Sequence, residues 1–224
     1  MTRMSGFHDC STTEGALTGL RMARGAIGRG DLVVLPTDTV YGIACDAFNA
    51  VAVAKLLSAK GRGRQSPPPV LVGSKSTLGA LAENTNEAID ALTEKFWPGG
   101  LTIIVPARGT LKWDLGETNG TVAVRMPDHP LAIELLTETG PLAVSSANLT
   151  GKPAALNAAE AKKQLGDSVS VYLEAGNASE SRTGSTIVDA TGTFEGKPLK
   201  LLREGSITKN QIEIALAGLT EVES

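Results

Sequence analysis

Aromatic residues, cysteine and histidine are scarce in this sequence of 224 residues. Aromatic side chains make up 4% of the chain, so a hydrophobic core has to be built from Val, Ile, Leu and Ala. The two cysteines, Cys10 and Cys45, form no Cys-x-x-Cys pair, which predicts two reduced thiols in a reducing compartment. Because His8 and His129 are the only histidines, we expect no zinc site built from protein ligands.

Long apolar runs are also missing. No stretch of about 20 consecutive apolar residues occurs, so the sequence predicts no membrane-spanning helix, and the N-terminus lacks the apolar core of a secretory signal. We therefore expect a cytoplasmic protein. The 24 acidic residues outnumber the 21 basic ones, and this balance disfavours a surface that coats nucleic acid. A local basic cleft remains compatible with it.

The common nucleotide-binding signatures are absent as well. The sequence contains neither Gly-x4-Gly-Lys-Ser/Thr nor Gly-x-Gly-x-x-Gly after a predicted strand. A serine hydrolase is disfavoured too, because Ser146 lacks a Gly-x-Ser-x-Gly context and a histidine partner. If the protein binds ATP, it has to use another arrangement of loops.

What the sequence does contain is an interleaved series of predicted strands and helices. Helices are predicted for residues 11–29, 49–59, 84–97, 129–139, 157–166 and 208–218, and strands for 32–35, 42–47, 69–72, 101–105, 121–126, 142–144, 169–173, 185–189 and 199–202. Since the two kinds of element do not alternate strictly, the pattern favours one α/β domain with a twisted mixed sheet and flanking helices. We predict a loose leader over residues 1–10, a catalytic domain over 11–218 and a tail over 219–224.

Two polar segments are candidates for chemistry. Pro-Thr-Asp-Thr-Val-Tyr-Gly, residues 36–42, follows a buried strand, where α/β proteins commonly place ligands. Lys60-Gly61-Arg62 supplies positive charge and a guanidinium fork that matches phosphate or carboxylate. Both also have a simpler interpretation, as a polar turn and as a solvated helix end whose cations favour the helix dipole.

Four further segments are weaker on their own. Residues 145–151, Ser-Ser-Ala-Asn-Leu-Thr-Gly, could hold phosphate oxygens or form a polar turn. Arg125 ends a predicted strand, where it could bind a carboxylate or be a surface charge. The remaining two are Ser-Thr-Ile-Val-Asp at residues 185–189 and Leu-Arg-Glu-Gly at residues 202–205.

Taken together and in this order, the six segments resemble the YrdC-like family of threonylcarbamoyl-AMP synthases. The resemblance covers nearly the whole chain, from residue 17 to residue 207. It implies a twisted α/β fold with a large basic cavity and a nucleotidyltransferase of the single-domain type. Such enzymes join L-threonine, bicarbonate and ATP into threonylcarbamoyl-adenylate and release pyrophosphate. The resemblance also implies a downstream transferase complex that modifies tRNA, with no stable binding of nucleic acid by this chain.

The resemblance further implies roles for individual residues. Threonine contacts fall on Thr37, Thr39, Lys60, Arg125, Val144 and Ser185, and ATP contacts on Arg62, Ser66, Thr121, Ser146, Asn148 and Arg203. The catalytic set would be Lys60, Arg62, Ser146 and Asn148. Mg²⁺ would arrive with ATP by bridging its phosphates, and no residue is assigned as a metal ligand. Gly63, Leu71 and Ala154 replace the proline, histidine and serine that are common in the family.

Two other functions remain open. A non-catalytic RNA-binding module could use the same basic cleft, although the acidic composition and the few aromatics disfavour it. A carbamoyl-transfer domain of a larger maturation enzyme is disfavoured because the sequence predicts no second domain.

Overall fold

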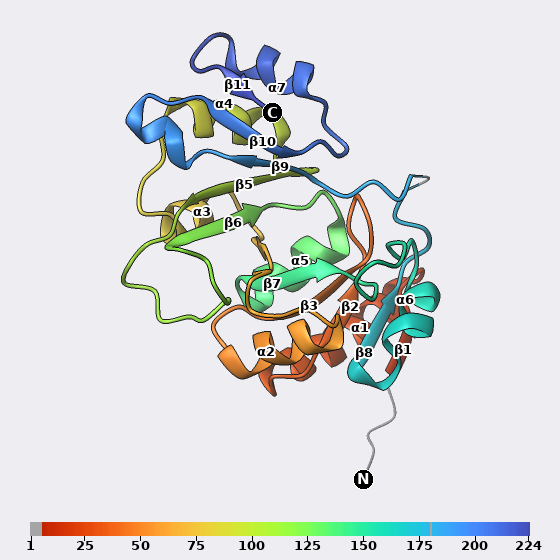
Figure 1. Cartoon of the computed structure of the whole chain (residues 1–224). Coiled ribbons are helices and arrows are strands. Elements are labelled where there is room, and N and C mark those ends of the chain that lie inside the picture. The colour runs from red at the N-terminus through yellow and green to blue at the C-terminus, as the bar shows by residue number, and fades with distance from the viewer. Residues whose placement is uncertain (1–5, 180) are drawn as a thin grey trace.

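The computed structural model describes residues 6–179 and 181–224, and these residues form one mixed sheet with helices packed against it (Figure 1). The strands are β1 Gly6–Asp9, β2 Val33–Leu35, β3 Gly42–Asp46, β4 Val70–Leu71, β5 Leu101–Pro106, β6 Thr121–Arg125, β7 Leu142–Ser146, β8 Val171–Glu174, β9 Thr186–Asp189, β10 Leu199–Arg203 and β11 Val222–Glu223. The helices are α1 Thr13–Gly28, α2 Ala50–Ala59, α3 Ser76–Leu81, α4 Glu87–Phe96, α5 Pro130–Thr139, α6 Ala158–Leu165 and α7 Lys209–Leu216, with 3₁₀ turns η1 Gly166–Ser168 and η2 Thr191–Glu195.

The strand order is β1-β8-β2-β3-β7-β4-β6-β5-β9-β10-β11. Parallel pairs, such as β4 with β6 and β5 with β9, alternate irregularly with antiparallel pairs, such as β3 with β7 and β5 with β6. The predicted mixed sheet is therefore confirmed. The sheet runs from β1 and β8 at one end of the molecule, where α6 lies, to β10 and β11 at the other, where α7 lies (Figure 1).

Both faces of the sheet carry a hydrophobic core, which explains why β2 is apolar throughout. Successive side chains of a strand point to opposite faces. Accordingly, Val33 and Leu35 pack in the cluster that contains residues of α1 and α5. Val34, between them, packs in the larger cluster that contains residues of α2, α4, α6 and α7. A strand buried on both sides reads as a continuous apolar run.

Helix starts are set by capping side chains that the sequence shows directly. Asn49 accepts a hydrogen bond from the Ala52 amide, and Thr208 forms a capping box with Gln211, as predicted. The first helix begins one residue later than predicted, because Thr12 rather than Ser11 is its cap. Similarly, α4 is capped by Asn86 and not by residue 84 or 85.

The predicted loose leader and tail are wrong where the structure describes them. Gly6–Asp9 pairs in parallel with β8, and Val222–Glu223 pairs with β10; residues 1–5 of the leader lie outside the described residues. Strands this short are stabilised by partners far away in the sequence, so local composition carries little signal for them. Helix α3 was also not predicted, and it has no side-chain cap. None of the helices in the described part of the chain has both the length and the apolar character needed to cross a membrane.

Candidate active site

Nine of the residues that the sequence assigns to a site line one cavity of about 420 Å³. They are Thr37, Thr39, Arg62, Arg125, Val144, Ser146, Asn148, Ser185 and Arg203. The cavity lies where the loop after β2 meets the ends of β6, β7 and β10 and the start of β9. Strands β3 and β7 lie close together in the cavity wall. A Cβ added at Gly42 would lie 2.6 Å from Cγ1 of Val144, so only glycine permits this approach.

Positive charge dominates the cavity wall. Five cationic side chains line it, namely Arg62, Arg125, Lys152, Arg182 and Arg203, and no aspartate or glutamate does. Arg125 is paired with Asp38 and Arg182 with Glu160. Burial, and then the charge of Arg62, lower the pKa of Arg203, so these two guanidinium groups act on each other without a carboxylate among the lining residues. Such a wall is suited to a ligand with several negative charges.

Sequence patterns do not predict Lys152 and Arg182 as site residues. Lys152 follows the Ser-Ala-Asn-Leu-Thr-Gly segment directly, so its position next to that segment was the only signal available. Arg182 belongs to the connection between β8 and β9, where no motif marks it. Its guanidinium donates to the carboxylate of Glu160 at 2.7 and 3.0 Å.

Arg125 is buried at the end of β6 and is held on three sides. Its Nη2 donates to Oδ1 of Asp38 at 2.6 Å, and its Nη1 donates to Oγ1 of Thr39 at 2.9 Å. Its Nε donates to the Gly99 carbonyl at 2.9 Å. Only 6% of the residue is exposed, so the alternative of a surface charge is wrong. Burial lowers the pKa of Arg125, and the charge of Asp38 opposes that shift.

The two threonines of the loop after β2 have different hydrogen-bonding capacity left. Thr37 donates its hydroxyl proton to the Val40 carbonyl at 2.7 Å, and it accepts from the Thr39 amide at 3.3 Å. In the 3.1 Å contact between the two hydroxyl groups, Thr39 is therefore the donor. Thr37 is saturated by these contacts, whereas Thr39 keeps one lone pair. Thr39 is thus the better hydrogen-bond acceptor for a ligand.

Lys60 does not line the cavity, in contrast to the direct ligand contacts that were predicted for it. Its side chain is buried, and Nζ donates to the carbonyl groups of Ser146 and Asn148, the latter at 2.8 Å. Its own carbonyl accepts from the hydroxyl of Thr150 at 2.8 Å. Burial, reinforced by the positive charge of Arg62, lowers the pKa of Lys60 to about 7. Lys60 therefore ties the end of α2 to the loop after β7.

The same loop is closed by Asn148. Both amide hydrogens of Asn148 are already in hydrogen bonds, since Nδ2 donates to the carbonyl groups of Leu149 and Lys152 at 2.9 and 2.8 Å. In this geometry the side chain has no donor left for a phosphate oxygen, and its buried Oδ1 has no hydrogen-bond partner among the described residues. Asn148 instead shapes the turn that brings Lys152 to the cavity. Arg62 is aligned by the same turn, because its Nε donates to Oγ1 of Thr150 at 3.1 Å.

A smaller, mostly apolar cavity of about 240 Å³ adjoins the first. It contains the predicted residue Thr121. The two cavities share five residues in their walls, namely Pro67, Pro69, Thr102, Ile187 and Arg203. Arg203 is fixed at this junction because Nε and Nη2 donate to the Ser185 carbonyl at 3.0 and 2.7 Å. Ser66 lines neither cavity.

Two of the three departures from the common family pattern lie in the wall of the larger cavity, and Gly63 lies outside it. Leu71 and Ala154 line the larger cavity and offer it no polar group. After Gly63, the side chain of Arg64 forms a bidentate pair with Asp114, at 3.0 and 2.8 Å. A Cβ at Gly116 would lie 2.5 Å from the Arg64 carbonyl, so the two loops are in close contact.

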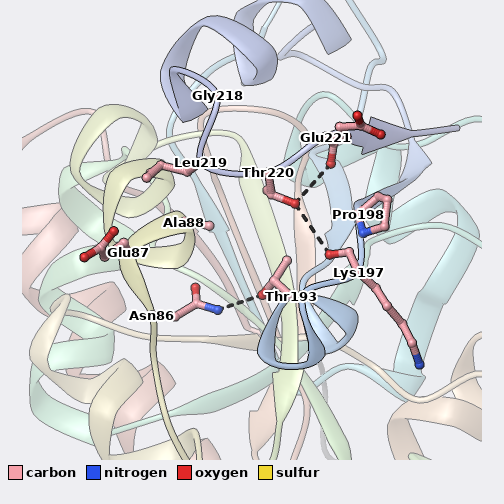
Figure 2. A pocket seen from close by; sticks show the side chains of 11 residues that line it. Asn86, Glu87, Ala88, Thr193, Lys197, Pro198, Gly218, Leu219, Thr220 and Glu221 are labelled. Carbon is pink, nitrogen blue, oxygen red and sulfur yellow. Dashed lines mark hydrogen bonds between the residues drawn. The ribbon is translucent and has the colours of Figure 1, made fainter.

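Figure 2 shows a larger hollow, of about 650 Å³, between the start of α4, η2 and the turn after α7. No residue assigned to a site lines it. Its charged side chains have both signs, because Glu87 and Glu221 line it together with Lys197. Asn86 is already paired with Thr193 at 2.8 Å. The cation-lined cavity is therefore the better candidate site.

This fold and cavity define a family of proteins. The Sua5/YciO/YrdC family, described as "Telomere recombination", matches residues 25–205. The chain belongs to this family. A protein of Mycobacterium tuberculosis H37Rv named putative threonylcarbamoyl-AMP synthase is 52% identical over 204 residues, which cover 91% of this chain and 92% of that protein. The threonylcarbamoyl-AMP synthase of Bacillus subtilis strain 168 is 36% identical over 199 residues, 88% of this chain and 56% of that protein.

Solved structures agree on the fold. Pyrococcus abyssi Sua5 complexed with L-threonine has a TM-score of 0.86 and 30% identity, over 98% of this chain and 62% of that one. Escherichia coli YciO has a TM-score of 0.81 over 93% of this chain and its own full length, and at 21% identity it supports the fold alone. The predicted single α/β domain of the YrdC-like type is confirmed.

Proposed function

We propose that this protein is an L-threonylcarbamoyladenylate synthase, which joins L-threonine, bicarbonate and ATP and releases pyrophosphate. Relatives that match this chain over nearly their whole length carry that name. The observation that carries the proposal is the division of charge in one cavity. Arg125 and Arg182 are each balanced by a carboxylate, whereas Arg62, Lys152 and Arg203 line the cavity and form no ion pair in the described part of the chain.

The balanced end fits an amino acid. A zwitterion has no net charge, so a guanidinium that is already compensated by Asp38 matches it better than an uncompensated cation would. Arg125 would hold the threonine carboxylate, and the remaining lone pair of Thr39 would accept from the ammonium group. Ser185, 2.8 Å from the Thr102 hydroxyl, and the strand end at Val144 would complete this end.

The uncompensated end fits a nucleoside triphosphate. Arg62, Lys152 and Arg203 would bind the phosphates, and Ser146 lines the same cavity. The adjoining apolar cavity with Thr121 would accept the adenine ring, since bases are held by apolar surface and a few polar contacts. Lys60 and Asn148 support this end through the loop after β7 and not by direct contact.

The chemistry follows from this placement. The threonine amine and bicarbonate form a carbamate with loss of water, and a carbamate oxygen then attacks the α-phosphate while pyrophosphate leaves. Negative charge develops on phosphate oxygens, and cations held in place stabilise it without a protein nucleophile. Bringing three reactants into one cavity removes most of the entropic barrier to their reaction.

Mg²⁺ belongs to the proposal as an ion carried by ATP. The described residues hold no group of three or more His, Cys, Asp or Glu side chains that could bind a metal, and this donor set fits an ion bound mainly by phosphates. Asn148 Oδ1, buried and unpartnered, is the protein acceptor that could face its water shell. When bound, the ion would neutralise charge on the leaving pyrophosphate.

The product would be used elsewhere. A mixed anhydride of a carbamate and AMP is an activated acyl donor, and we propose that a transferase complex passes its threonylcarbamoyl group to adenosine in tRNA. The cytoplasm, where ATP, threonine and tRNA are present, is the proposed location.

The purified protein should release pyrophosphate only when ATP, L-threonine and bicarbonate are all present, because the attacking carbamate requires the last two. A coupled pyrophosphate assay with single omissions checks this, with L-alanine in place of threonine as the matched control. Release without threonine would contradict the proposal. Tight binding of tRNA with no release at all would favour the RNA-binding module.

The Arg64–Asp114 pair should affect nucleotide binding more than stability. We expect Arg64→Ala to raise the KM for ATP by about threefold, because the 61–69 loop leads to Pro67 and Pro69 in the cavity wall. Both side chains are largely exposed, so the melting temperature should change by less than about 2 °C. Asp114→Ala should have the same effect, and the double variant no more than either. Additive effects would show that the pair does not act as a unit.

A further inference from the structure

Asp38 is the one charged residue of the segment 36–42, and it touches the site without lining it. Its Oδ1 accepts from Nη2 of Arg125 at 2.6 Å and from the Asp128 amide at 2.9 Å. The side chain of Asp38 is 19% exposed and that of Arg125 is 7% exposed, so the pair is shielded from solvent. A shielded ion pair with a second hydrogen bond to backbone is a rigid one.

The contacts of Arg125 show what this pair does. Gly99 and Thr39 are neutral acceptors, so Asp38 supplies all of the negative charge that the guanidinium contacts in the described part of the chain. Three acceptors in three directions also fix the plane of the guanidinium. Without Asp38, the group would keep two contacts and lose its counter-charge.

The neighbouring cations make the counter-charge important. Arg62 and Arg203 line the same cavity, and their charges act on each other. If Arg125 were uncompensated as well, four of the five cations that line the cavity would lack a carboxylate partner among the described residues. Phosphate groups would then bind at the amino-acid end as well as at the nucleotide end.

We propose that Asp38 is a positioning residue for amino-acid recognition: it orients the guanidinium of Arg125 and balances its charge, so that this end of the cavity accepts a zwitterion and rejects free phosphate. This inference rests on the proposed function and deepens it. Orientation and charge balance are separable, because an amide oxygen in place of the carboxylate keeps the hydrogen bonds and removes the charge.

Two variants test the two parts. In Asp38→Ala the guanidinium loses its orientation, so the KM for L-threonine should rise by about 10- to 100-fold while kcat changes by less than about threefold, since the contact is made equally in ground and transition states. In Asp38→Asn the KM should stay within about fivefold of the wild type, because the hydrogen bonds remain. The inhibition constant of inorganic phosphate, measured in competition with threonine, should fall about tenfold in Asp38→Asn.

Titration calorimetry with L-threonine and with a non-hydrolysable ATP analogue accompanies the kinetics. Glu138→Ala, which removes an exposed ion pair with Arg24 away from the cavity, is the control and should behave as the wild type. A threonine affinity for Asp38→Ala equal to that of the wild type overturns the inference. Phosphate inhibition that is unchanged in Asp38→Asn also overturns it. The same holds if either variant loses affinity for the ATP analogue as much as for threonine. If the wild type itself showed no threonine-dependent pyrophosphate release, the proposed function would fail instead.

Discussion

Arg125→Ala is expected to lower kcat/KM for L-threonine by about 10²- to 10³-fold, the usual cost of removing one partner of a buried, hydrogen-bonded charge pair. The guanidinium of Arg125 is paired with Asp38, and it also donates to Thr39 and to the Gly99 carbonyl. Its loss would remove the carboxylate contact of threonine and leave Asp38 buried without a cation. Steady-state kinetics with threonine as the varied substrate measures the effect.

Two further variants make this test specific. Arg125→Lys keeps the positive charge but cannot donate in three fixed directions, so it should recover less than about a tenth of the lost kcat/KM. Arg108→Ala removes a half-buried arginine that lies outside the cavity and donates to the backbone of residues 79 and 80, and it should have no effect on threonine kinetics. Binding of an ATP analogue should remain within about threefold of the wild type in Arg125→Ala, because the nucleotide end retains its three cations. Equal losses for threonine and the analogue would show that the substrates do not occupy separate ends of the cavity.

Lys60→Met should lower kcat by about 10²-fold even though Lys60 does not line the cavity, because a displacement of about 1 Å in a catalytic segment has such effects. The ammonium group holds the carbonyl groups of Ser146 and Asn148, and through them the loop that places Arg62 and Lys152. Methionine keeps the apolar stem and removes the donors. Each carbonyl left unpaired should reduce the free energy of unfolding by about 1–3 kcal/mol.

The pKa of Lys60 adds a pH dependence with a definite sign. Its value is about 7 in the folded protein against 10.5 for an ordinary lysine. Between these two pH values the unfolded chain binds one proton more than the folded chain at this site, so the contribution of Lys60 to stability increases as pH rises from about 7 towards 10.5. Above that window both states are neutral, and below it both are charged.

Thermal denaturation of the wild type and Lys60→Met across this pH range measures the difference. The gap between their free energies of unfolding should widen as the pH rises from 7 to 10. Lys55→Met is the matched control, since Lys55 lies on α2 just before Lys60 and also donates to a backbone carbonyl, that of Gly30 at 2.9 Å. A gap that stays constant with pH, or a control that behaves like Lys60→Met, would contradict the role given to Lys60.

Local sequence was sufficient for most of the secondary structure. Caps such as Asn49, Asn157 and Thr208 act within three residues, so their effect can be predicted from neighbours alone. The continuous apolar run of β2 likewise predicts that this strand is buried on both faces. The collinear motifs identified the family and nine of the residues that line the cavity, because a motif records which residue types a site needs.

The tertiary structure decided which of those side chains line the cavity and which support the others. Asp38 and Arg125 are 87 residues apart, and Lys60 and Asn148 are 88 residues apart. Hydrogen bonds over such separations depend on how the sheet brings its strand ends together, and no pattern within a few residues reports them. For the same reason the sequence placed Lys60 among the ligand contacts, left out Lys152 and Arg182, and treated β1 and β11 as loose ends. The charge balance of the cavity, on which the proposed amino-acid and nucleotide ends rest, exists only in the folded chain.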